Sequence, residues 1–338
     1  MTRRKDEEDA ARDDPSSSAS IVVPSTPASA ASCEIIPTHA RTIDDALRGG
    51  IRTRMLTEIV GESGAAKSHL CCQLALCAQL AFPSGASVVY VHTEGPPPVR
   101  RLRALATSRR FIEHFGSAER ASAALDRIYI VNALGDGDAM LDALGSLSAA
   151  LRYPVDANAP VRMIIVDSVA APFRDELGGA SAGGHSSSSS SSSSWAYTMR
   201  RAGTLHKATM LLKEYAARHD LACVVTNHVV DSMRSNGANA NGDETRVLRA
   251  IGEAMTSGRL VVPALGLAWG HCVNARCFVT RRAKRRAVAA VAGDEGGNGD
   301  DDNDASSVER TFRVVYAPHC APTAVGFVVR DDGAWGAE

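Results

Sequence analysis

The stretch MLTEIVGESGAAKSHL, Met55 to Leu70, decides the fold class of this chain. A short apolar run leads into a loop of small residues, and an apolar-periodic helix follows Lys67 and Ser68. The backbone N–H groups of such a loop converge on an anion, and the positive end of the following helix adds to the attraction. The spacing therefore predicts a phosphate-binding loop in which Lys67 reaches the terminal phosphates and Ser68 is a ligand of Mg2+. The residues expected to bind ATP are Gly61, Glu62, Ser63, Gly64, Ala65, Ala66, Lys67 and Ser68.

One position departs from the pattern G-x-x-x-x-G-K-[ST], because Ala66 replaces the second glycine. Where a left-handed backbone is needed, a Cβ costs roughly 1–2 kcal/mol, or about tenfold in affinity. Small neighbours at Ser63, Gly64 and Ala65 still permit close approach of the backbone to a phosphate. We expect a weakened site. On the motif alone, an ordinary turn followed by a chance Lys-Ser pair remains an open alternative.

Two carboxylates follow other strand-like runs. Val161 to Asp167, VRMIIVD, is a continuous apolar run ending in an acid, as is typical of a buried parallel strand. Asp167 is therefore expected to hold the water shell of Mg2+. Glu94 follows the apolar stretch Ser87 to His92, and a carboxylate at such a strand end is able to orient the water that attacks a γ-phosphate. A solvated loop acid is the alternative interpretation of Glu94.

Strand-like runs alternate with helical patterns, such as the amphipathic stretch Thr204 to His219. Alternation of this kind predicts a mostly parallel, twisted sheet with helices on both faces, and a ligand at the carboxyl ends of the strands. The predicted strands are Leu56–Val60, Val88–Val91, Ile128–Val131, Met163–Val166 and Ala222–Thr226. Two later strands, Cys277–Thr280 and Thr311–Tyr316, flank an acidic stretch and predict a C-terminal hairpin extension.

Four segments contain more specific sequence motifs: LRGGI at Leu47 to Ile51, YVHTEG at Tyr90 to Gly95, IIVDSVAAPFR at Ile164 to Arg174 and VVTNHVV at Val224 to Val230. In this order they resemble the ATPase core of the RecA-type recombinases. The similarity is greatest to the eukaryotic paralogues of the strand-exchange recombinase, in particular the X-ray-repair cross-complementing paralogue of the third group. The segments that carry this finer resemblance are LTEIVGES, RRLRAL, PALGLAWGHCVNARCF and VVYAPHCAP.

The resemblance covers roughly residues 41 to 330 and implies an α/β, RecA-like P-loop ATPase core. It implies ATP and Mg2+ as cofactors, with Lys67 and Glu94 as catalytic residues. In the family a glutamine after Thr-Asn senses the γ-phosphate, and here that place is held by His228. Histidine still donates a hydrogen bond, but its reach is shorter and its charge varies near neutral pH. A strand-end histidine with a backbone partner is the alternative.

The family also places two loops over the DNA axis, and their counterparts are about Phe173 to Arg201 and Asp231 to Gly258. Phosphate binding requires a positive excess, whereas this chain has a formal net charge of −1. Composition alone favours solvated loops, and the resemblance favours DNA contact with a partner subunit supplying the rest. The candidate DNA-binding residues are Arg174, Arg200, Arg201, Arg234, Arg246 and Arg249.

Composition indicates one folded domain between segments of low complexity. Hydrophobic residues make up 45% of the 338 residues, which suffices for one sizeable core. We expect a disordered tail over residues 1–38, because it is charged and then rich in Ser, Pro and Ala. The RecA-like core is expected over 39–332, with low-complexity insertions at 178–194 and 292–307 and a short tail at 333–338.

Nothing in the sequence is typical of a signal peptide or a membrane span. Eight cysteines without C-x-x-C spacing favour buried, reduced thiols. The basic cluster RRAKRR, Arg281 to Arg286, has three open explanations: the charged end of an edge strand, a nuclear-import patch, or a contact with the DNA backbone.

Three functions follow, and the first is favoured. It is an ATP-binding subunit in homologous-recombination repair of DNA double-strand breaks and in junction processing, with weak DNA-stimulated hydrolysis. Its expected partners are another recombinase paralogue in a heterodimer, the strand-exchange recombinase itself, and single-stranded or branched DNA; its expected location is the nucleus, with the cytoplasm as a further location. The second is a non-catalytic adaptor that keeps the fold but little nucleotide binding. The third, a P-loop kinase or hexameric helicase, is disfavoured because VDSVAA and PALG match the recombinase branch.

Overall fold

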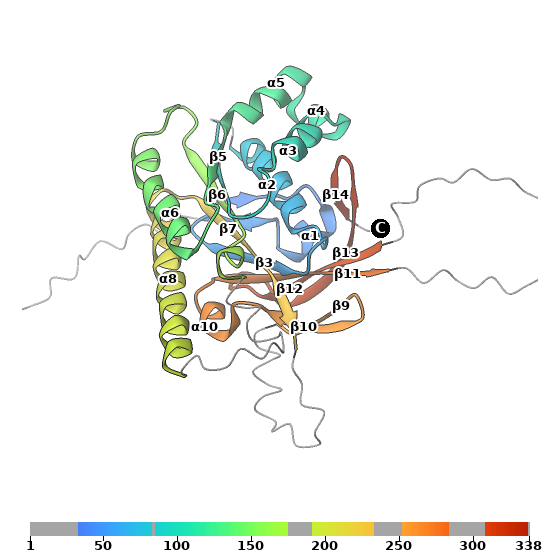
Figure 1. The fold of residues 1–338 in the computed structure, drawn as a ribbon. Helices are drawn as coiled ribbons and strands as arrows, with labels where there is room; N and C mark the ends of the chain where they lie inside the picture. Colours follow the sequence, from blue (N-terminus) through green and yellow to red (C-terminus); the bar gives the residue numbers. More distant parts are fainter. Residues whose placement is uncertain (1–32, 83–84, 175–190, 233–251, 284–307, 337–338) are drawn as a thin grey trace, which may run out of the picture. The chain divides into compact units, whose positions relative to one another are not determined.

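The apolar runs of the sequence form the centre of a nine-stranded sheet in the computed structural model (Figure 1). The structure describes residues 33–82, 85–174, 191–232, 252–283 and 308–336, all of which belong to one unit, Cys33–Glu338. The strand order is β14-β13-β12-β11-β3-β7-β6-β4-β5. The bounds are β3 (Leu56–Gly61), β4 (Ser87–His92), β5 (Ile128–Asn132), β6 (Val161–Asp167), β7 (Ala222–Asn227), β11 (Ala275–Ala283), β12 (Val308–Tyr316), β13 (Thr323–Arg330) and β14 (Gly333–Gly336).

The strands from β11 through β3, β7, β6 and β4 to β5 pair in parallel, and β11 to β14 pair antiparallel. Parallel strands need helical crossovers, so helices cover both faces. The predicted α/β class, with a parallel sheet and a C-terminal antiparallel extension, is confirmed. All seven predicted strands are present.

Two hydrophobic clusters fill the space on the two faces of the sheet. One face packs against α1, α2 and α3, and the other packs against α6, α8 and α10 (Figure 1). The helix α2 lies in the core, since Leu70 to Ala78 are all buried. The helices are α1 (Arg41–Ala46), α2 (Lys67–Ala81), α3 (Val99–Ala106), α4 (Arg109–Phe115), α5 (Ala118–Ala123), α6 (Gly137–Arg152), α8 (Ser191–Arg218), α10 (Gly266–Gly270) and the 3-10 helices η1 (Ala124–Arg127) and η2 (Ala171–Phe173).

Two small sheets accompany the large one. The first pairs β1 (Ile35–Ile36) with β2 (Ile51–Arg52). The second has the order β8-β10-β9, with β8 (Val229–Asp231), β10 (Arg259–Pro263) and β9 (Ala254–Thr256). Because β8 starts two residues after β7 ends, this second sheet begins at the carboxyl edge of the large sheet.

The folded part extends further at both ends than the sequence predicts. Ile36 is fully buried in the core and pairs with Ile51, so the tail predicted to end at residue 38 is shorter. The predicted C-terminal tail is instead β14, which pairs with β13 and buries Ala334. Both segments are too short to show a hydrophobic period, and tertiary packing decides their structure.

Two further expectations need correction. The helix predicted over Thr204 to His219 begins at Ser191, so the end of the predicted insertion 178–194 is helical.

In addition, β11 is not an edge strand, because it pairs with β3 on one side and β12 on the other. Arg281 and Arg282 lie within this strand, and Lys284 to Arg286 lie outside the described residues. Residues 1–32, residues 178–190 of the expected insertion 178–194 and the expected insertion 292–307 also lie outside them.

All eight cysteines are described, and all are free thiols. Five of them are buried, as the sequence predicts: Cys71, Cys72, Cys77, Cys223 and Cys277. Within the described part of the chain, no helix is long and apolar enough to cross a membrane.

A buried polar cluster lies where β3, β7 and β11 meet. Glu58 and Arg276 are both fully buried and form an ion pair. Asn227 Nδ2 and Trp269 Nε1 each donate to Glu58 Oε1 at 2.7 Å. A charge in such surroundings is stable only with its partners, and these partners connect the three strands that support the candidate site.

We predict that Arg276→Met lowers the free energy of unfolding by about 3–5 kcal/mol, because it leaves the Glu58 carboxylate buried without its cation. Urea unfolding measures this change. The matched control is Arg218→Ala, which removes an exposed arginine paired with Glu214 and is expected to cost well under about 1 kcal/mol. Equal losses of unfolding free energy in the two variants would show that the buried pair contributes no more to stability than an exposed one.

Candidate nucleotide-binding site

The predicted phosphate-binding loop connects the end of β3 at Gly61 to the start of α2 at Lys67. Ala66 precedes the helix with φ 88° and ψ 18°, so the left-handed backbone that glycine favours is occupied by a residue with a Cβ. Gly64 also has a left-handed backbone, with φ 76°. No side chain caps the first turn of α2, and its N–H groups remain available to an anion.

Lys67 is almost fully buried and bonds to its own loop. Its ammonium donates to the carbonyl oxygens of Gly61 at 2.7 Å and Glu62 at 3.0 Å. Burial lowers the pKa of Lys67, while the negative charges of Asp167 and Glu94 act in the opposite direction. A phosphate is a stronger acceptor for this ammonium than two carbonyl groups.

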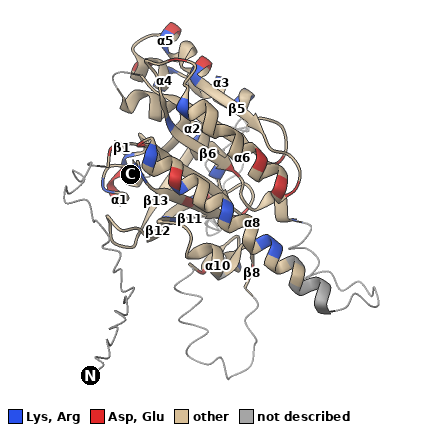
Figure 2. Ribbon diagram, turned by 90° about the vertical axis from the view of Figure 1, so that its left-hand side faces the viewer, with Lys and Arg blue, Asp and Glu red and all other residues tan. Residues whose placement is uncertain are grey.

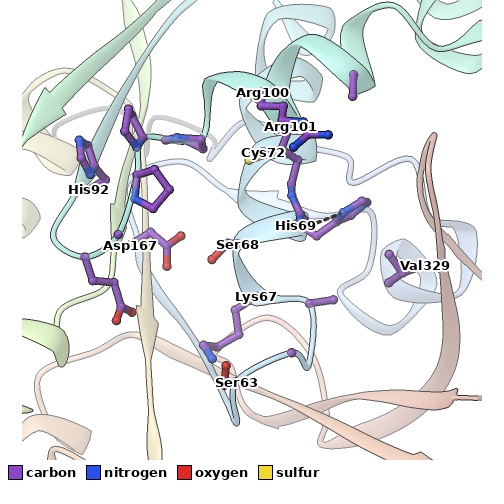
Figure 3. A pocket seen from close by; sticks show the side chains of 18 of the residues that line it. Ser63, Lys67, Ser68, His69, Cys72, His92, Arg100, Arg101, Asp167 and Val329 are labelled. Atoms are coloured by element: carbon purple, nitrogen blue, oxygen red, sulfur yellow. Dashed lines mark hydrogen bonds between the residues drawn. The ribbon is translucent and has the colours of Figure 1, made fainter.

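Asp167, at the end of β6, is oriented by two hydroxyl groups from neighbouring strands. Tyr90 Oη donates to its Oδ2 at 2.7 Å, and Thr226 Oγ1 donates to its Oδ1. In the parallel register, Asp167 lies opposite His92 of β4. Figure 3 shows the side chains of Asp167, Ser68 and Lys67 pointing into the same space.

Glu94 is not a solvated loop acid. His228 Nε2 lies 2.8 Å from its Oε1, Arg174 forms an ion pair with its Oε2, and Ser168 Oγ donates to Oε1 at 3.4 Å. The hydrogen bond with His228 and the contact with Arg174 lower the pKa of Glu94 to about 2, although burial acts in the opposite direction. We call Glu94, His228, Arg174 and Ser168 the Glu94 cluster.

One cleft of about 2240 Å³ is lined by residues of the loop together with Asp167, Glu94, Arg174 and His228. From the phosphate-binding loop it extends along α3 and β13. On the α3 side, Arg101 Nη1 donates to His69 Nδ1 at 2.9 Å (Figure 3). Burial, together with the charges of Arg101 and Arg310, lowers the pKa of His69 to about 4, so its imidazole is neutral at pH 7. Its volume exceeds the roughly 300–1,000 Å³ of ordinary ligand sites, which leaves room for a nucleoside beside the phosphate loop.

Glu62 of the phosphate loop bonds to the second small sheet. Its Oε1 accepts hydrogen bonds from Thr256 Oγ1 and Ser257 Oγ, each at 2.6 Å, and from Arg281 Nε at 3.1 Å. Arg259 also pairs with its Oε2 at 3.4 Å. Burial alone would raise the pKa of Glu62, but the hydrogen bonds outweigh it and lower the pKa. The loop conformation therefore depends on β9, β10 and β11.

The candidate DNA-binding arginines lie in different parts of the structure. Arg174 points at Glu94, inside the cleft. Arg200 and Arg201 are the tenth and eleventh residues of α8, and further Lys and Arg residues follow along the helix (Figure 2). Arg234, Arg246 and Arg249 lie outside the described residues.

Sequence reasoning missed the residues that orient the site. Tyr90 and Thr226, which hold Asp167, lie in the quoted strand segments, and only the strand register reveals their role. The contact between His69 and Arg101 spans 32 positions and has no sequence pattern. Glu62 was expected only to bind phosphate through the loop, and its carboxylate instead bonds to β9 and its neighbours.

A parallel sheet covered on both faces, a loop with the pattern of a phosphate site after a central strand and a carboxylate at a neighbouring strand end together define a RecA-like P-loop core. A family model described as Rad51 matches residues 31–260. The chain therefore belongs to the Rad51 family, and the resemblance found in the sequence is confirmed.

Several relatives are similar over most of the chain. The DNA repair protein XRCC3 homolog of Arabidopsis thaliana is 31% identical over 305 residues, which cover 88% of this chain and 91% of that protein. DNA repair protein XRCC3 of Bos taurus is 28% identical, covering 87% of this chain and 72% of that protein. DNA repair protein RAD51 homolog 2 of Mus musculus is 27% identical, covering 74% and 67%. The similarity supports an XRCC3-like paralogue within the family.

We predict that Ala66→Gly raises the free energy of unfolding by about 1 kcal/mol, because it removes the Cβ from a left-handed position. Urea unfolding measures this gain, and an unchanged m-value would show that the two proteins expose the same surface on unfolding. Ala65→Gly is the matched control: Ala65 is buried and is not among the left-handed residues, so the same substitution is expected to cost about 0.5–1 kcal/mol. If both variants are destabilised alike, Ala66 carries no strain.

Proposed function

We propose that this chain is an ATP-binding subunit in homologous-recombination repair of DNA double-strand breaks and in junction processing. The observation that carries the proposal is the convergence of Lys67, Ser68, Asp167 and Glu94 in one cleft at the carboxyl ends of β3, β4 and β6. The phosphate loop and Lys67 bind the phosphates of ATP. Family membership and the DNA repair relatives support the biological role.

The donor set fits Mg2+. Ser68 offers an exposed hydroxyl at the start of α2, and Asp167 offers an oriented carboxylate. Among the described residues no group of three His, Cys, Asp or Glu is arranged to hold a metal ion. This agrees with Mg2+, which takes one or two protein ligands and completes its shell with water and phosphate oxygens. When bound, Mg2+ neutralises charge that develops on the β- and γ-phosphates.

Hydrolysis by this site is expected to be weak. Glu94 is the candidate base that orients the attacking water, but its carboxylate is occupied by three partners. A carboxylate with a lowered pKa accepts a proton less readily. We infer that His228 acts on Glu94 as well as toward the γ-phosphate that its position in the family pattern implies. Both features favour nucleotide binding over rapid turnover.

We propose that the chain works with another recombinase paralogue, in a heterodimer, on single-stranded or branched DNA, and that it acts in the nucleus. The strand-exchange recombinase is a further candidate partner. Arg200 and Arg201 are the described residues proposed for DNA contact on α8, which carries five basic residues and one acidic residue. DNA affinity that falls steeply with salt concentration would support this part of the proposal.

The second candidate is an adaptor that keeps the fold but binds little nucleotide. The presence of Ala66 favours it, because its Cβ occupies a place where the phosphate-binding pattern has a glycine and restricts the close approach of a phosphate to the backbone. An adaptor needs the surface of the fold and does not need Lys67.

We predict that the full-length protein binds a fluorescent ATP analogue in the presence of Mg2+, that Ala66→Gly binds it up to about tenfold more tightly, and that Lys67→Ala abolishes binding. Titration with fluorescence anisotropy measures the Kd. Lys207→Ala, which removes an exposed lysine on α8, is the matched control and leaves the Kd unchanged.

A repair assay in cells that lack the protein separates the two candidates. An ATP-dependent subunit loses repair activity in the Lys67→Ala form. No analogue binding by the parent chain, together with full repair by Lys67→Ala, would contradict the proposal and establish the adaptor.

A further inference from the structure

The guanidinium of Arg174 lies in the cleft proposed for ATP, and only part of it is engaged. Its Nη2 forms the ion pair with Glu94 Oε2 and lies 3.4 Å from His228 Nε2. Within the described part of the chain, both of these contacts involve Nη2, so the Nε and Nη1 donors have no protein partner. An arginine presents five N–H donors in a planar fork, and the spare donors are able to bind a second anion while the ion pair persists.

The backbone before Arg174 fixes where that second anion lies. Arg174 follows η2, whose residues Pro172 and Phe173 are buried, and Phe173 packs in the core beside the sheet. The side chain of Arg174 is 60% exposed and lines the same cleft as Lys67 and Glu94. It therefore reaches an anion in this cleft from an anchored turn, without rearrangement of the fold.

Two carboxylates make the cleft unfavourable for a terminal phosphate unless cations offset them. Burial lowers the pKa of Lys67, whereas the negative charges of Asp167 and Glu94 act to raise it. Glu94 is thus within electrostatic range of a phosphate that Lys67 holds, and its charge repels that phosphate. The cation that offsets Glu94 is Arg174, which forms its ion pair.

We propose that Arg174 is a ligand of the γ-phosphate and that it determines the preference of this site for ATP over ADP. The inference rests on the proposed ATP-binding function, and it assigns to the nucleotide an arginine that the sequence offered for DNA. Arg174 bridges Glu94 and the γ-phosphate through its spare donors. ADP has no phosphate at this place and gains nothing from the guanidinium.

His228 alone serves this purpose poorly, although the family pattern implies it as the γ-phosphate sensor. Its Nε2 lies 2.8 Å from Glu94 Oε1 and 3.1 Å from Ser168 Oγ, so this nitrogen is already engaged. Its side chain is 23% exposed, and the strands β7 and β8 flank it in the chain. A guanidinium keeps its charge at every pH at which proteins are folded, whereas the charge of an imidazole varies near neutral pH.

The test compares the Kd of a non-hydrolysable ATP analogue with the Kd of ADP, both with Mg2+, in the full-length protein and in Arg174→Ala. Isothermal titration calorimetry measures both constants. We expect the variant to bind the ATP analogue about tenfold more weakly, which is the effect of losing one hydrogen bond to a charged group, and to bind ADP as the parent does. Arg174→Lys keeps the charge but loses the planar fork, so its Kd for the ATP analogue should lie between the two.

A second pair of variants separates a direct contact from simple neutralisation of Glu94. Glu94→Gln removes the repelling charge and with it the ion pair. If Arg174 contacts the γ-phosphate, adding Arg174→Ala to Glu94→Gln still weakens binding of the ATP analogue about tenfold. If Arg174 only neutralises Glu94, the added substitution leaves the Kd unchanged, and this result would overturn the inference.

The matched control is Arg218→Ala, which removes an exposed arginine paired with Glu214 on α8 and should leave both Kd values unchanged. Equal weakening of the ATP analogue and ADP by Arg174→Ala, or weakening of neither, would also overturn the inference. Failure of the proposed function has a different signature, because the parent protein would then bind neither nucleotide. Thermal unfolding without nucleotide verifies that each variant is folded.

Discussion

The parallel register of β3, β7, β6 and β4 is the constraint on which the rest of this structure depends. Because the four strands run in one direction and pair without long offsets, their carboxyl ends meet at one edge of the sheet. Side chains far apart in the sequence, Lys67, Asp167 and Glu94, thereby line one cleft. The buried ion pair of Glu58 and Arg276 stabilises this arrangement of strands, since it connects β3 to β11 and, through Asn227, to β7.

The phosphate loop is held from two sides, and this explains how it tolerates a strained residue. Lys67 closes the loop internally through the carbonyl groups of Gly61 and Glu62. The Glu62 carboxylate fixes the outer side through Thr256, Ser257 and arginines of β10 and β11. A residue with a Cβ keeps a left-handed backbone only where several surrounding contacts fix that conformation. The contacts of Lys67 and Glu62 fix the loop around Ala66 in this way.

Much of the fold could be predicted from the sequence because its central strands are continuous apolar runs and its helices have apolar residues at three- and four-residue spacing. The loop between β3 and α2 and the place of Asp167 at a strand end were equally accessible, since both follow continuous apolar strands; their roles toward phosphate and Mg2+ stay predictions. The contacts of Glu94 could not be predicted, because Arg174 and His228 lie 80 and 134 positions away. The strand β14 and the early start of α8 were missed, since Gly333–Gly336 and a serine run carry no hydrophobic period and are decided by tertiary packing.

The proposed function requires that this loop bind the phosphates of ATP although Ala66 replaces a glycine. The most direct measurement is an experimental structure of the full-length protein with a non-hydrolysable ATP analogue and Mg2+. We predict that the Lys67 ammonium leaves the carbonyl oxygens of Gly61 and Glu62 and contacts the phosphates, with Ser68 and Asp167 beside the metal. A nucleotide bound elsewhere in the cleft, with Lys67 still bonded to both carbonyl groups, would contradict it.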